Sequence, residues 1–426
     1  MTDFLWGAAT SSYQLDGGPA SDWARWEEAG RLYARHERCG AGTGHDRRWE
    51  ADLSLLPAIG ANAYRFSVEW SRIEPERGRI EGAPLEELRR RVEYLRASGI
   101  DPMLTLFHYT HPAWFWGFGW DRREGREAFL GFVRRVADAV GDLVGWYSLL
   151  NEPIVFLLGG YLDGCIPPGR KDFAAGGRAL EGMLRCFGEA AAILRGANPD
   201  ARFGIAHNML DFAPERAHAW ADRLLTRAAD RFYNLALLEG MATGDFDLRM
   251  PLVGRARFRI PDLPASIDFV GVNYYSRVHL KFPGRTRLAG DFSYRDRHGR
   301  GLTDLGWEIH PAGLERSLRE AARSGKPVIV TENGIATRND ALRADFLREH
   351  ALVLLHARER GLDLRGYFHW SLLDNFEWLE GFAPRFGLFE VDYATLARRR
   401  RPSADVFAML GRSFARPALR EDFRSP

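Results

Sequence analysis

Cysteine is scarce in this chain of 426 residues, which contains only Cys39, Cys165 and Cys186. An odd, sparse set without a CxxC spacing is not typical of a disulfide framework or of a structural zinc site. Long apolar runs are also lacking, because no apolar stretch approaches the roughly 18 residues that a transmembrane helix needs. Residues 1–4 (MTDF) are not a basic region followed by an apolar segment, so we expect no signal peptide. These absences together favour a cytoplasmic protein.

Lysine is nearly absent too, since it occurs at positions 171, 281 and 326 alone and arginine supplies the other basic residues. The formal net charge of +2 gives no indication of a nucleic-acid or membrane surface. The run Arg398–Arg401 fits a solvated loop better than a polyanion site. Hydrophobic residues make up 46% of the chain, so the composition predicts a folded protein with a large core. We therefore expect neither nucleic acid nor a membrane as a partner.

Short apolar runs alternate with longer amphipathic segments along the chain. The expected strands are Leu5–Ala9, Ala63–Ser67, Pro102–Phe107, Gly145–Leu150, Arg202–Ala206, Phe269–Asn273, Val328–Thr331 and Arg365–Trp370. The expected helices are Asp46–Ile59, Leu85–Ser98, Gly125–Val140, Ala179–Arg195, Leu224–Glu239, Leu314–Ser324, Asp340–Arg360 and Ala404–Leu410. This repetition predicts a single α/β domain over residues 1–426, a (β/α)8 barrel of the TIM type. The stretch Phe282–Leu302, rich in Gly and Arg, is expected to be a rim loop between the sixth and seventh strands.

Two of the expected strands end at a glutamate. Glu152 follows the fourth strand and precedes Pro153, and Glu332 follows the seventh strand and precedes Asn333-Gly334. The carboxyl ends of the strands form the functional face of such a barrel. Polar strand ends are common, so either glutamate alone would be weak evidence. Two carboxylates that face each other are the groups needed to cleave a glycosidic bond.

Nearly all of the remaining expected strands also have polar or aromatic residues at or just beyond their ends. Because all strands of the barrel end at one face, we expect these side chains to meet in one pocket. They are Gln14, Arg65, His108, Asn151, His207 with Asn208, Asn273 with Tyr275, and Trp370 with Glu377 and Trp378. A dense set of hydrogen-bonding groups beside aromatic rings is typical of a site that binds a sugar.

The motifs at these positions resemble those of glycoside hydrolase family 1, the β-glucosidase and β-galactosidase group. They follow the family's order from FLWGAATSSYQ at residues 4–14 to FGL at 386–388, so the resemblance covers almost the whole chain. Between these ends lie YRFSVEWSRI at 64–73, NEP at 151–153, VNYY at 272–275, TENG at 331–334 and HWSLLDNFEW at 369–378. All of these motifs together are highly specific.

The resemblance implies a retaining mechanism in which the two glutamates have different roles. Glu332 would be the nucleophile that forms a glycosyl-enzyme. Glu152 would be the acid that protonates the leaving oxygen and then the base that activates water. Retention requires carboxyl groups about 5–5.5 Å apart. Arg65 and Tyr275 resemble the groups that keep the nucleophile charged by lowering its pKa, and Asn273 would support Tyr275 and the nucleophile rather than touch the sugar.

The resemblance also assigns the sugar contacts. Trp370 would stack on the apolar face of the sugar, and the residues that bind its hydroxyls would be Gln14, His108, Asn151, Glu377 and Trp378. Glu377 suits free hydroxyls at the 4- and 6-positions and would repel a 6-phosphate, so phosphorylated sugars are disfavoured. Tyr109 lies at the rim of the sugar site where the family often has Trp, and His111 adds a polar group there. These differences leave the preference for glucose, galactose or fucose open.

The sequence thus predicts a β-glucosidase, with possible β-galactosidase or β-fucosidase side activity, that acts on a small glycoside or short oligosaccharide without a metal or other cofactor. A transglycosidase would use the same two carboxylates, and the sequence does not separate the two activities. A non-catalytic sugar-binding relative would lack one catalytic glutamate. A metal-dependent hydrolase is a further alternative, but its candidate ligands form no HxH or HxxxH pair at a strand end: His36, His45, His108, His111 and His207.

Overall fold

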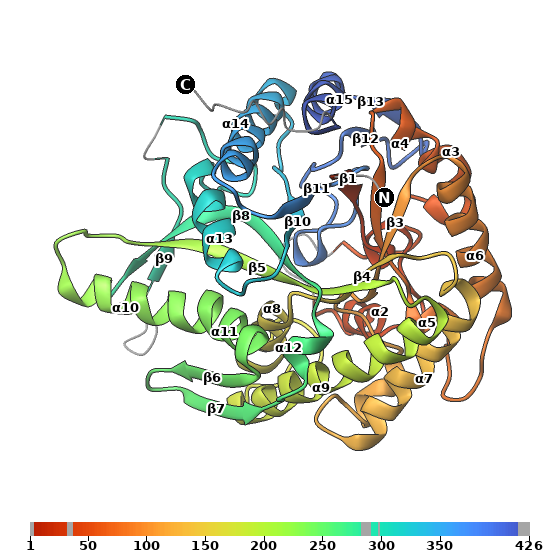
Figure 1. Ribbon diagram of the computed structural model, residues 1–426, viewed down its shortest axis with the longest axis horizontal. Coiled ribbons are helices and arrows are strands. Elements are labelled where there is room, and N and C mark those ends of the chain that lie inside the picture. Colours follow the sequence, from red (N-terminus) through yellow and green to blue (C-terminus); the bar gives the residue numbers. More distant parts are fainter. Residues whose placement is uncertain (1–3, 32–36, 283–290, 297–298, 416–426) are drawn as a thin grey trace, which may run out of the picture.

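The computed structural model describes residues 4–31, 37–282, 291–296 and 299–415. In these ranges eight parallel strands close into a barrel in the order β10-β11-β1-β2-β3-β4-β5-β8, and β8 pairs back with β10 (Figure 1). The expected (β/α)8 barrel is confirmed. Its strands are β1 (Leu5–Ala9), β2 (Ala63–Ser67), β3 (Asp101–Phe107), β4 (Trp146–Asn151), β5 (Arg202–Pro214), β8 (Phe269–Lys281), β10 (Val328–Asn333) and β11 (Leu364–Trp370).

Each expected strand is present, and only β5 and β8 are much longer than predicted. They continue together beyond the barrel, where β9 (Asp291–Ser293) pairs antiparallel with the end of β8. The described part of the expected rim loop 282–302 therefore includes a strand. The rest of that loop, at 283–290 and 297–298, lies outside the described residues, as do residues 1–3 and His36.

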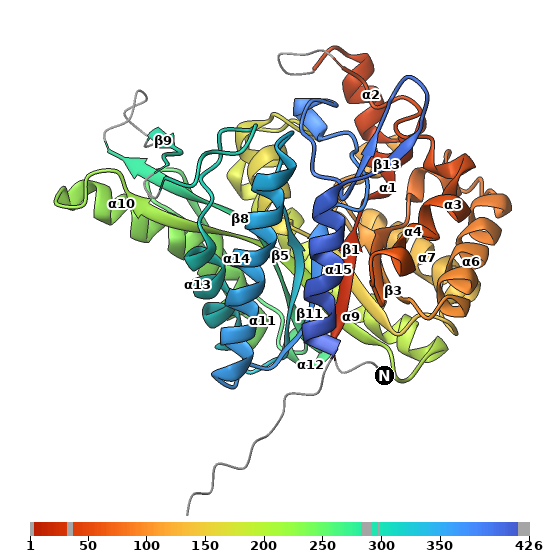
Figure 2. The same cartoon turned by 90° about the horizontal axis from the view of Figure 1, so that it is seen from above.

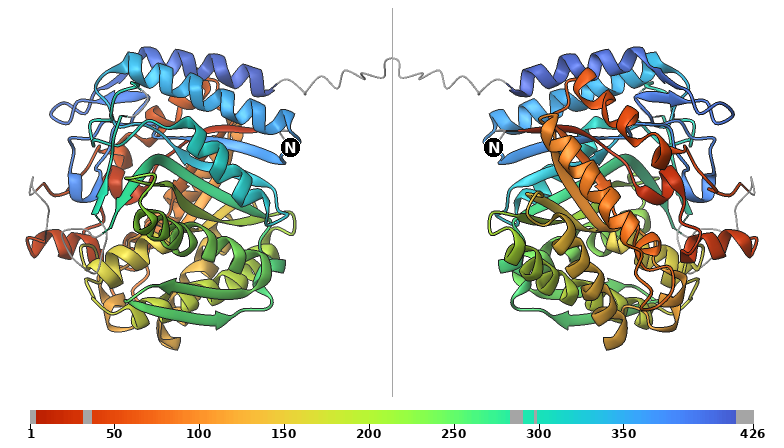
Figure 3. Two further views of the ribbon diagram at one scale, coloured as in Figure 1. Left: turned by 90° about the vertical axis from the view of Figure 1, so that its left-hand side faces the viewer. Right: turned by 90° about the vertical axis from the view of Figure 1, so that its right-hand side faces the viewer.

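Helices cover the outside of the barrel on both sides (Figure 3). The main helices between strands are α6 (Gly82–Ala97), α7 (Arg123–Val140), α9 (Phe173–Ala197), α11 (Ala236–Thr243), α13 (Pro311–Ala322) and α14 (Asp340–Glu359), and α15 (Pro402–Ala415) packs against α14. Other helices in the connections are α1 (Ser12–Asp16), α2 (Asp22–Glu28), α3 (Trp49–Leu53), α4 (Leu55–Ala58), α5 (Trp70–Ile73), α8 (Pro153–Leu157), α10 (Trp220–Asp230) and α12 (Leu263–Ser266).

Two expected helices are interrupted. The segment expected as the helix Asp46–Ile59 contains α3 and α4 as separate pieces, because the ring of Pro57 would collide with the carbonyl of Leu53 in a continuous helix. The helix expected at Leu224–Glu239 becomes α10 and α11, joined by a π-helical turn at Arg231–Leu235. Such turns occur frequently at functional sites.

Two pairs of short strands have no counterpart among the expected elements. β6 (Asp245–Met250) and β7 (Gly254–Arg259) form an antiparallel hairpin beside α9 and α11 (Figure 1). β12 (Phe389–Val391) pairs antiparallel with β13 (Arg398–Arg400). Short pairs of this kind lie outside the repeating pattern of strand and helix, so that pattern does not predict them.

The arginine run at 398–401 is not the solvated loop that its composition suggests. Arg398 donates to the buried carboxylate of Asp52 at 2.7 and 2.8 Å. Arg401 is 9% exposed and pairs with the buried carboxylate of Asp374 at 2.8 Å. Buried acidic partners distant in sequence therefore stabilise this end of the fold through charge-assisted hydrogen bonds.

Apolar side chains fill the interior of the barrel, in a cluster that includes Leu5, Met103, Phe269, Ile329 and Phe368. A larger apolar cluster packs the strands against the helices. Figure 2 shows α2, β9 and β13 at the end of the molecule opposite the N-terminus. That end is where the barrel strands finish, and it carries the polar residues considered next. Within the described ranges, no helix is both long enough and apolar enough to span a membrane.

Candidate active site

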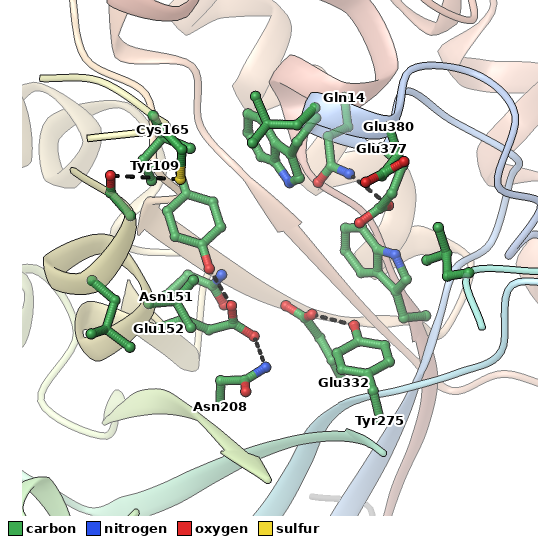
Figure 4. Close-up of a pocket in the computed structure, with 18 of the residues that line it drawn as sticks. Gln14, Tyr109, Asn151, Glu152, Cys165, Asn208, Tyr275, Glu332, Glu377 and Glu380 are labelled. Carbon is green, nitrogen blue, oxygen red and sulfur yellow. Dashed lines mark hydrogen bonds between the residues drawn. The ribbon is translucent and has the colours of Figure 1, made fainter. Parts of the chain in front are cut away.

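The two glutamates reach one pocket from different strands. Glu332 is the fifth residue of β10, and Glu152 follows β4 directly, at the N-cap of α8. Figure 4 shows their carboxyl groups turned toward one another across the pocket. The pairing of β10 with β8 shifts register between Val330 and Glu332. Irregularities of this kind re-aim side chains next to active sites.

Backbone constraints explain the residues around each glutamate. Glu152 has a φ of 48°, in the left-handed region that residues other than Gly rarely adopt. Pro153 follows as the first residue of α8, where the N–H that it lacks would have no intrahelical partner. Beyond Glu332, a Cβ atom at Gly334 would lie 1.8 Å from the carbonyl oxygen of Trp370. The chain therefore needs Gly where β10 passes β11.

Glu332 is almost fully buried between a cation and a hydroxyl. The Arg65 guanidinium donates to Oε1 of Glu332, and the Tyr275 hydroxyl donates to Oε2 at 2.6 Å. Burial raises the pKa of Glu332 to about 7, while Arg65 and Tyr275 lower it and the charge of Glu152 adds to the rise. Arg65 and Tyr275 therefore make the expected contacts and lower this pKa as expected, but burial outweighs them. The cost of removing the carboxylate from water exceeds the two favourable contacts.

Glu152 is held by three hydrogen-bond donors. Asn273 and Asn208 donate to Oε1 from their Nδ2 atoms at 2.7 and 3.0 Å, and the Tyr109 hydroxyl donates to Oε2 (Figure 4). Neighbouring strands supply the two amides, because Asn208 of β5 pairs with Asn273 of β8 in register. This carboxyl group is therefore fixed in orientation from two sides.

The side chain of Asn273 does not support the nucleophile in the way that the sequence suggested. Its amide donates to Glu152 and, at 3.2 Å, to Oδ1 of Asn151. Its Oδ1 accepts a hydrogen bond of 2.6 Å from the hydroxyl of Thr331. No hydrogen bond joins Asn273 to Tyr275 among the described residues. Asn273 therefore orients Glu152, and it reaches Glu332 only through the neighbouring residue in β10.

Arg65 links the surroundings of the two glutamates. Besides Glu332, it donates to Oδ1 of Asn151 at 2.6 Å and to the carbonyl oxygen of Thr331 at 3.2 Å. Arg65 is 1% exposed, and its planar fork of donors can serve several acceptors in fixed directions. The residue next to Glu152 and the carboxylate of Glu332 are thus positioned by one side chain.

The expected sugar-contacting residues gather on the other side of the pocket. Nδ2 of Asn151 donates to Nε2 of His108 at 3.4 Å, and burial followed by the charge of Arg65 holds the pKa of His108 well below its usual range. The His108 ring lies parallel to the rings of Trp370 and Trp378, at 6.0 and 6.2 Å between centroids. The structure therefore brings a neutral imidazole and two indoles together beside Glu332.

Glu377 and Gln14 complete this side. The amide of Gln14 already has partners inside the protein, because its Nε2 donates to the carbonyl oxygen of Phe376 at 2.8 Å and lies 3.2 Å from Oδ1 of Asn375 and 3.3 Å from Oε2 of Glu377. Burial raises the pKa of Glu377 to about 8, and the charges of Glu332 and Glu152 add to that rise. Both residues line the pocket. Apart from His111 and His207, the residues proposed for this site from the sequence therefore line the pocket or hydrogen-bond to residues that line it.

The pocket has a volume of about 460 Å³, within the usual range for small-molecule sites. The lining beyond the residues proposed from the sequence is largely apolar, which the sequence analysis did not anticipate. Tyr233 comes from the π-helical turn, and Trp307 comes from the connection before α13. The other apolar or aromatic lining residues that sequence reasoning missed include Trp23, Val155, Leu158, Ile166, Leu210, Tyr294, Leu305, Leu379 and Phe386.

Two histidines expected at the rim lie elsewhere. His111 is buried, its Nδ1 is 3.0 Å from Asp22, and its Nε2 accepts from the Trp120 indole at 2.8 Å, so it is not a sugar-site group. His207 contacts the backbone carbonyl of Asn234 at 3.0 Å. Successive strand residues point to opposite faces, which is why Asn208 enters the pocket and His207 does not.

Within the described ranges, no three His, Cys, Asp or Glu side chains cluster in a way that could hold a metal ion.

The fold and the site agree with comparisons to known proteins. The sequence model described as Glycosyl hydrolase family 1 matches residues 1–413. The chain belongs to glycosyl hydrolase family 1. Beta-glucosidase A of Thermotoga maritima is 34% identical over 421 residues, covering 93% of this chain and 94% of that protein.

Solved structures of other family 1 proteins are also similar. The β-glycosidase from Pyrococcus horikoshii superposes with a TM-score of 0.87 at 34% identity and covers 97% of this chain and 96% of its own. The β-glucosidase from Thermotoga maritima in complex with glucoimidazole gives a TM-score of 0.87 at 32% identity, covering 97% of this chain and 98% of its own. The family 1 resemblance is confirmed, and the chain is an O-glycosyl hydrolase.

Proposed function

We propose that this family 1 enzyme is a retaining β-glucosidase, with Glu332 as the nucleophile and Glu152 as the acid and base. The observation that carries the assignment is the contrast between the two carboxyl groups. Glu332 is paired with the Arg65 cation and the Tyr275 hydroxyl, whereas Glu152 is held by neutral groups alone among the described residues. A cation favours a carboxylate that must stay charged until it attacks.

In the first step, a carboxylate oxygen of Glu332 attacks C1 of the sugar while the bond from C1 to the leaving oxygen breaks. Glu152 gives its proton to that oxygen, and the aglycone departs as an alcohol or phenol. In the second step, Glu152 takes a proton from water, whose oxygen attacks C1 and releases Glu332. One side chain, Glu152, therefore serves as the acid in the first step and as the base in the second.

The sugar would lie on the side of the pocket formed by His108, Trp370 and Glu377. His108 lines the pocket with its ring parallel to those of Trp370 and Trp378, which places its imidazole next to a sugar bound there. Glu377 supplies oxygen acceptors beside Trp370. Relatives named β-glucosidase support glucose as the preferred sugar. A relative from Pyrococcus woesei, 29% identical, is named β-galactosidase, which supports the proposed side activity.

Azide rescue tests the two roles. Glu152→Ala and Glu332→Ala are assayed separately with an aryl β-glucoside, with and without sodium azide. Azide should give the β-glycosyl azide with Glu152→Ala, because it attacks the glycosyl-enzyme in place of water. It should give the α-glycosyl azide with Glu332→Ala, because it replaces the nucleophile. The opposite anomers would overturn the assignment.

The cytoplasmic location and the extent of the domain over residues 1–426 stay predictions.

A further inference from the structure

The two oxygens of the Glu152 carboxyl group have different kinds of partner. Oε1 accepts hydrogen bonds from the amides of Asn208 and Asn273, at 3.0 and 2.7 Å. Oε2 contacts the Tyr109 hydroxyl, which Figure 4 shows on the opposite side of the carboxyl group from Asn208. A side-chain amide nitrogen only donates, whereas a hydroxyl both donates and accepts.

The contacts of Arg65 settle which atom of Asn273 faces Glu152. A guanidinium only donates, so the Asn151 atom that lies 2.6 Å from Arg65 must be the oxygen Oδ1. The Asn273 atom 3.2 Å from that oxygen must then be the nitrogen. The same nitrogen lies 2.7 Å from Oε1 of Glu152. A proton on Oε1 would therefore point at an N–H group, and the site disfavours it there.

We propose that the catalytic proton of Glu152 is carried on Oε2 and that Tyr109 is the positioning residue that follows its movement. This inference rests on the proposed acid and base role of Glu152. With Glu152 protonated and no substrate bound, the Oε2 proton is donated to the Tyr109 oxygen, and when a glycoside binds this proton turns to the leaving oxygen. When that proton passes to the leaving oxygen, the Tyr109 hydroxyl turns and donates to the new carboxylate. In the second step a water proton returns to Oε2, and the Tyr109 hydroxyl turns back.

The backbone and the packing fix Tyr109 for this role. Its φ is 69° and that of Glu152 is 48°, so both partners are held in the left-handed region. The Tyr109 ring packs edge-on against Trp378 at 5.4 Å and is 7% exposed. Burial, and then the charge of Glu152, raise the pKa of Tyr109 well above its usual range, so the phenol keeps its own proton. The family often has Trp at this position, and an indole N–H could only donate.

The test is Tyr109→Phe, which removes one oxygen, assayed over a series of aryl and alkyl β-glucosides that differ in leaving-group acidity. For poor leaving groups, kcat/KM should fall about 10- to 100-fold, the loss expected for a hydrogen bond to a charged group. For 2,4-dinitrophenyl β-glucoside, whose leaving group departs without being protonated, kcat/KM should change less than about threefold. A fall that is equal for all leaving groups, or no fall, would overturn the proposal.

Two controls separate this proposal from its premise and from misfolding. Tyr94→Phe, in α6 and outside the pocket, should match the wild type in the series and in thermal unfolding. For Glu152→Ala, the loss in kcat/KM must be much larger for poor leaving groups than for good ones. If it is not, the proposed function fails. If the loss depends on the leaving group for Glu152→Ala but not for Tyr109→Phe, only the role of Tyr109 fails.

A second variant covers the case in which Tyr109→Phe does not fold. 3-Fluorotyrosine placed at position 109 keeps the ring and makes the hydroxyl a stronger donor. The alkaline limb of kcat/KM, where the enzyme loses the proton of its acid, should then move to lower pH, because the carboxylate is stabilised. An unmoved limb, or one that moves to higher pH, would contradict the role of Tyr109.

Discussion

The hydroxyl of Tyr275 donates a hydrogen bond of 2.6 Å to Oε2 of Glu332, in a pocket that raises the pKa of that carboxyl group to about 7. The hydrogen bond lowers the pKa, so it opposes burial and the charge of Glu152. It favours the ionised form that nucleophilic attack requires. The pH dependence of the enzyme should therefore respond directly to this contact.

Tyr275→Phe should move the acid limb of kcat/KM to higher pH. The limb reports ionisation of Glu332 in the free enzyme, and removal of a donor to the carboxylate raises the pKa further. At neutral pH we expect kcat/KM to fall about 10- to 100-fold, as for the loss of a hydrogen bond to a charged group. A pH profile from 4 to 9 measures both effects, with Tyr161→Phe, outside the pocket, as the matched control. A limb at lower pH than in the wild type would contradict this account.

Glu332→Gln should stabilise the fold above pH 7. A carboxyl group whose pKa rises from 4.5 to about 7 on folding favours the folded state below pH 4.5, and that stability is lost as the pH rises through 7. Gln resembles the protonated acid, so the variant should match the wild type at pH 4 and exceed it at pH 8 by up to about 3 kcal/mol. Urea unfolding at the two pH values measures the difference. Equal stabilities at pH 8 would refute the raised pKa.

Phosphorylated glycosides should be poor substrates. Five carboxyl groups line the described pocket and no Lys or Arg side chain does: the acids are Glu152, Asp163, Glu332, Glu377 and Glu380. Even with the pKa of Glu332 at about 7 and that of Glu377 at about 8, the carboxyl groups that are ionised would repel a 6-phosphate, and no basic side chain of the described pocket would compensate for this repulsion. At pH 7, kcat/KM for an aryl 6-phospho-β-glucoside should be at least about 100-fold below that of the unphosphorylated glucoside. Comparable values for the two substrates would show that the pocket accepts the phosphate.

The aglycone should be apolar. Beyond the residues proposed to bind the sugar, the pocket lining includes Leu158, Ile166, Leu210 and Trp307, and burial of apolar area contributes about 25 cal/mol per Å². Octyl and methyl β-glucoside have similar leaving groups, so their comparison isolates this contact. We expect KM for the octyl substrate to be about tenfold lower than KM for the methyl substrate. Leu210→Asn should reduce this difference in KM. If KM is the same for the octyl and methyl substrates, these apolar residues do not form the aglycone site.

The sequence predicted the barrel, and it predicted that Glu152 and Glu332 would reach one pocket, because both expectations rest on local information. Apolar runs mark the eight strands, and Glu152 and Glu332 lie beside Pro and Gly residues that the backbone requires at those points. The direction of the Asn273 contacts was not predictable, because it depends on the register of β8 with β5 and β10.

Burial was the other quantity that the sequence did not reveal. Arg65 and Tyr275 lower the pKa of Glu332 as the sequence suggested, but the sequence did not show that burial of the carboxyl group outweighs both. Tyr233 lies on a helical connection rather than at a strand end, so no strand motif indicates it, although its hydroxyl holds Asn208 at 2.6 Å. His111 shows the opposite error, since a polar residue near the rim turned inward to Asp22.

Trapping of the covalent intermediate tests the central claim most directly. The enzyme is treated with 2,4-dinitrophenyl 2-deoxy-2-fluoro-β-glucoside, which slows release of the sugar from the nucleophile, and is then digested for mass spectrometry. The account predicts one fluorosugar per chain, attached to the peptide that contains Glu332, and no labelling of Glu332→Gln. A label on Glu152 or on another residue, or turnover without any covalent intermediate, would contradict it.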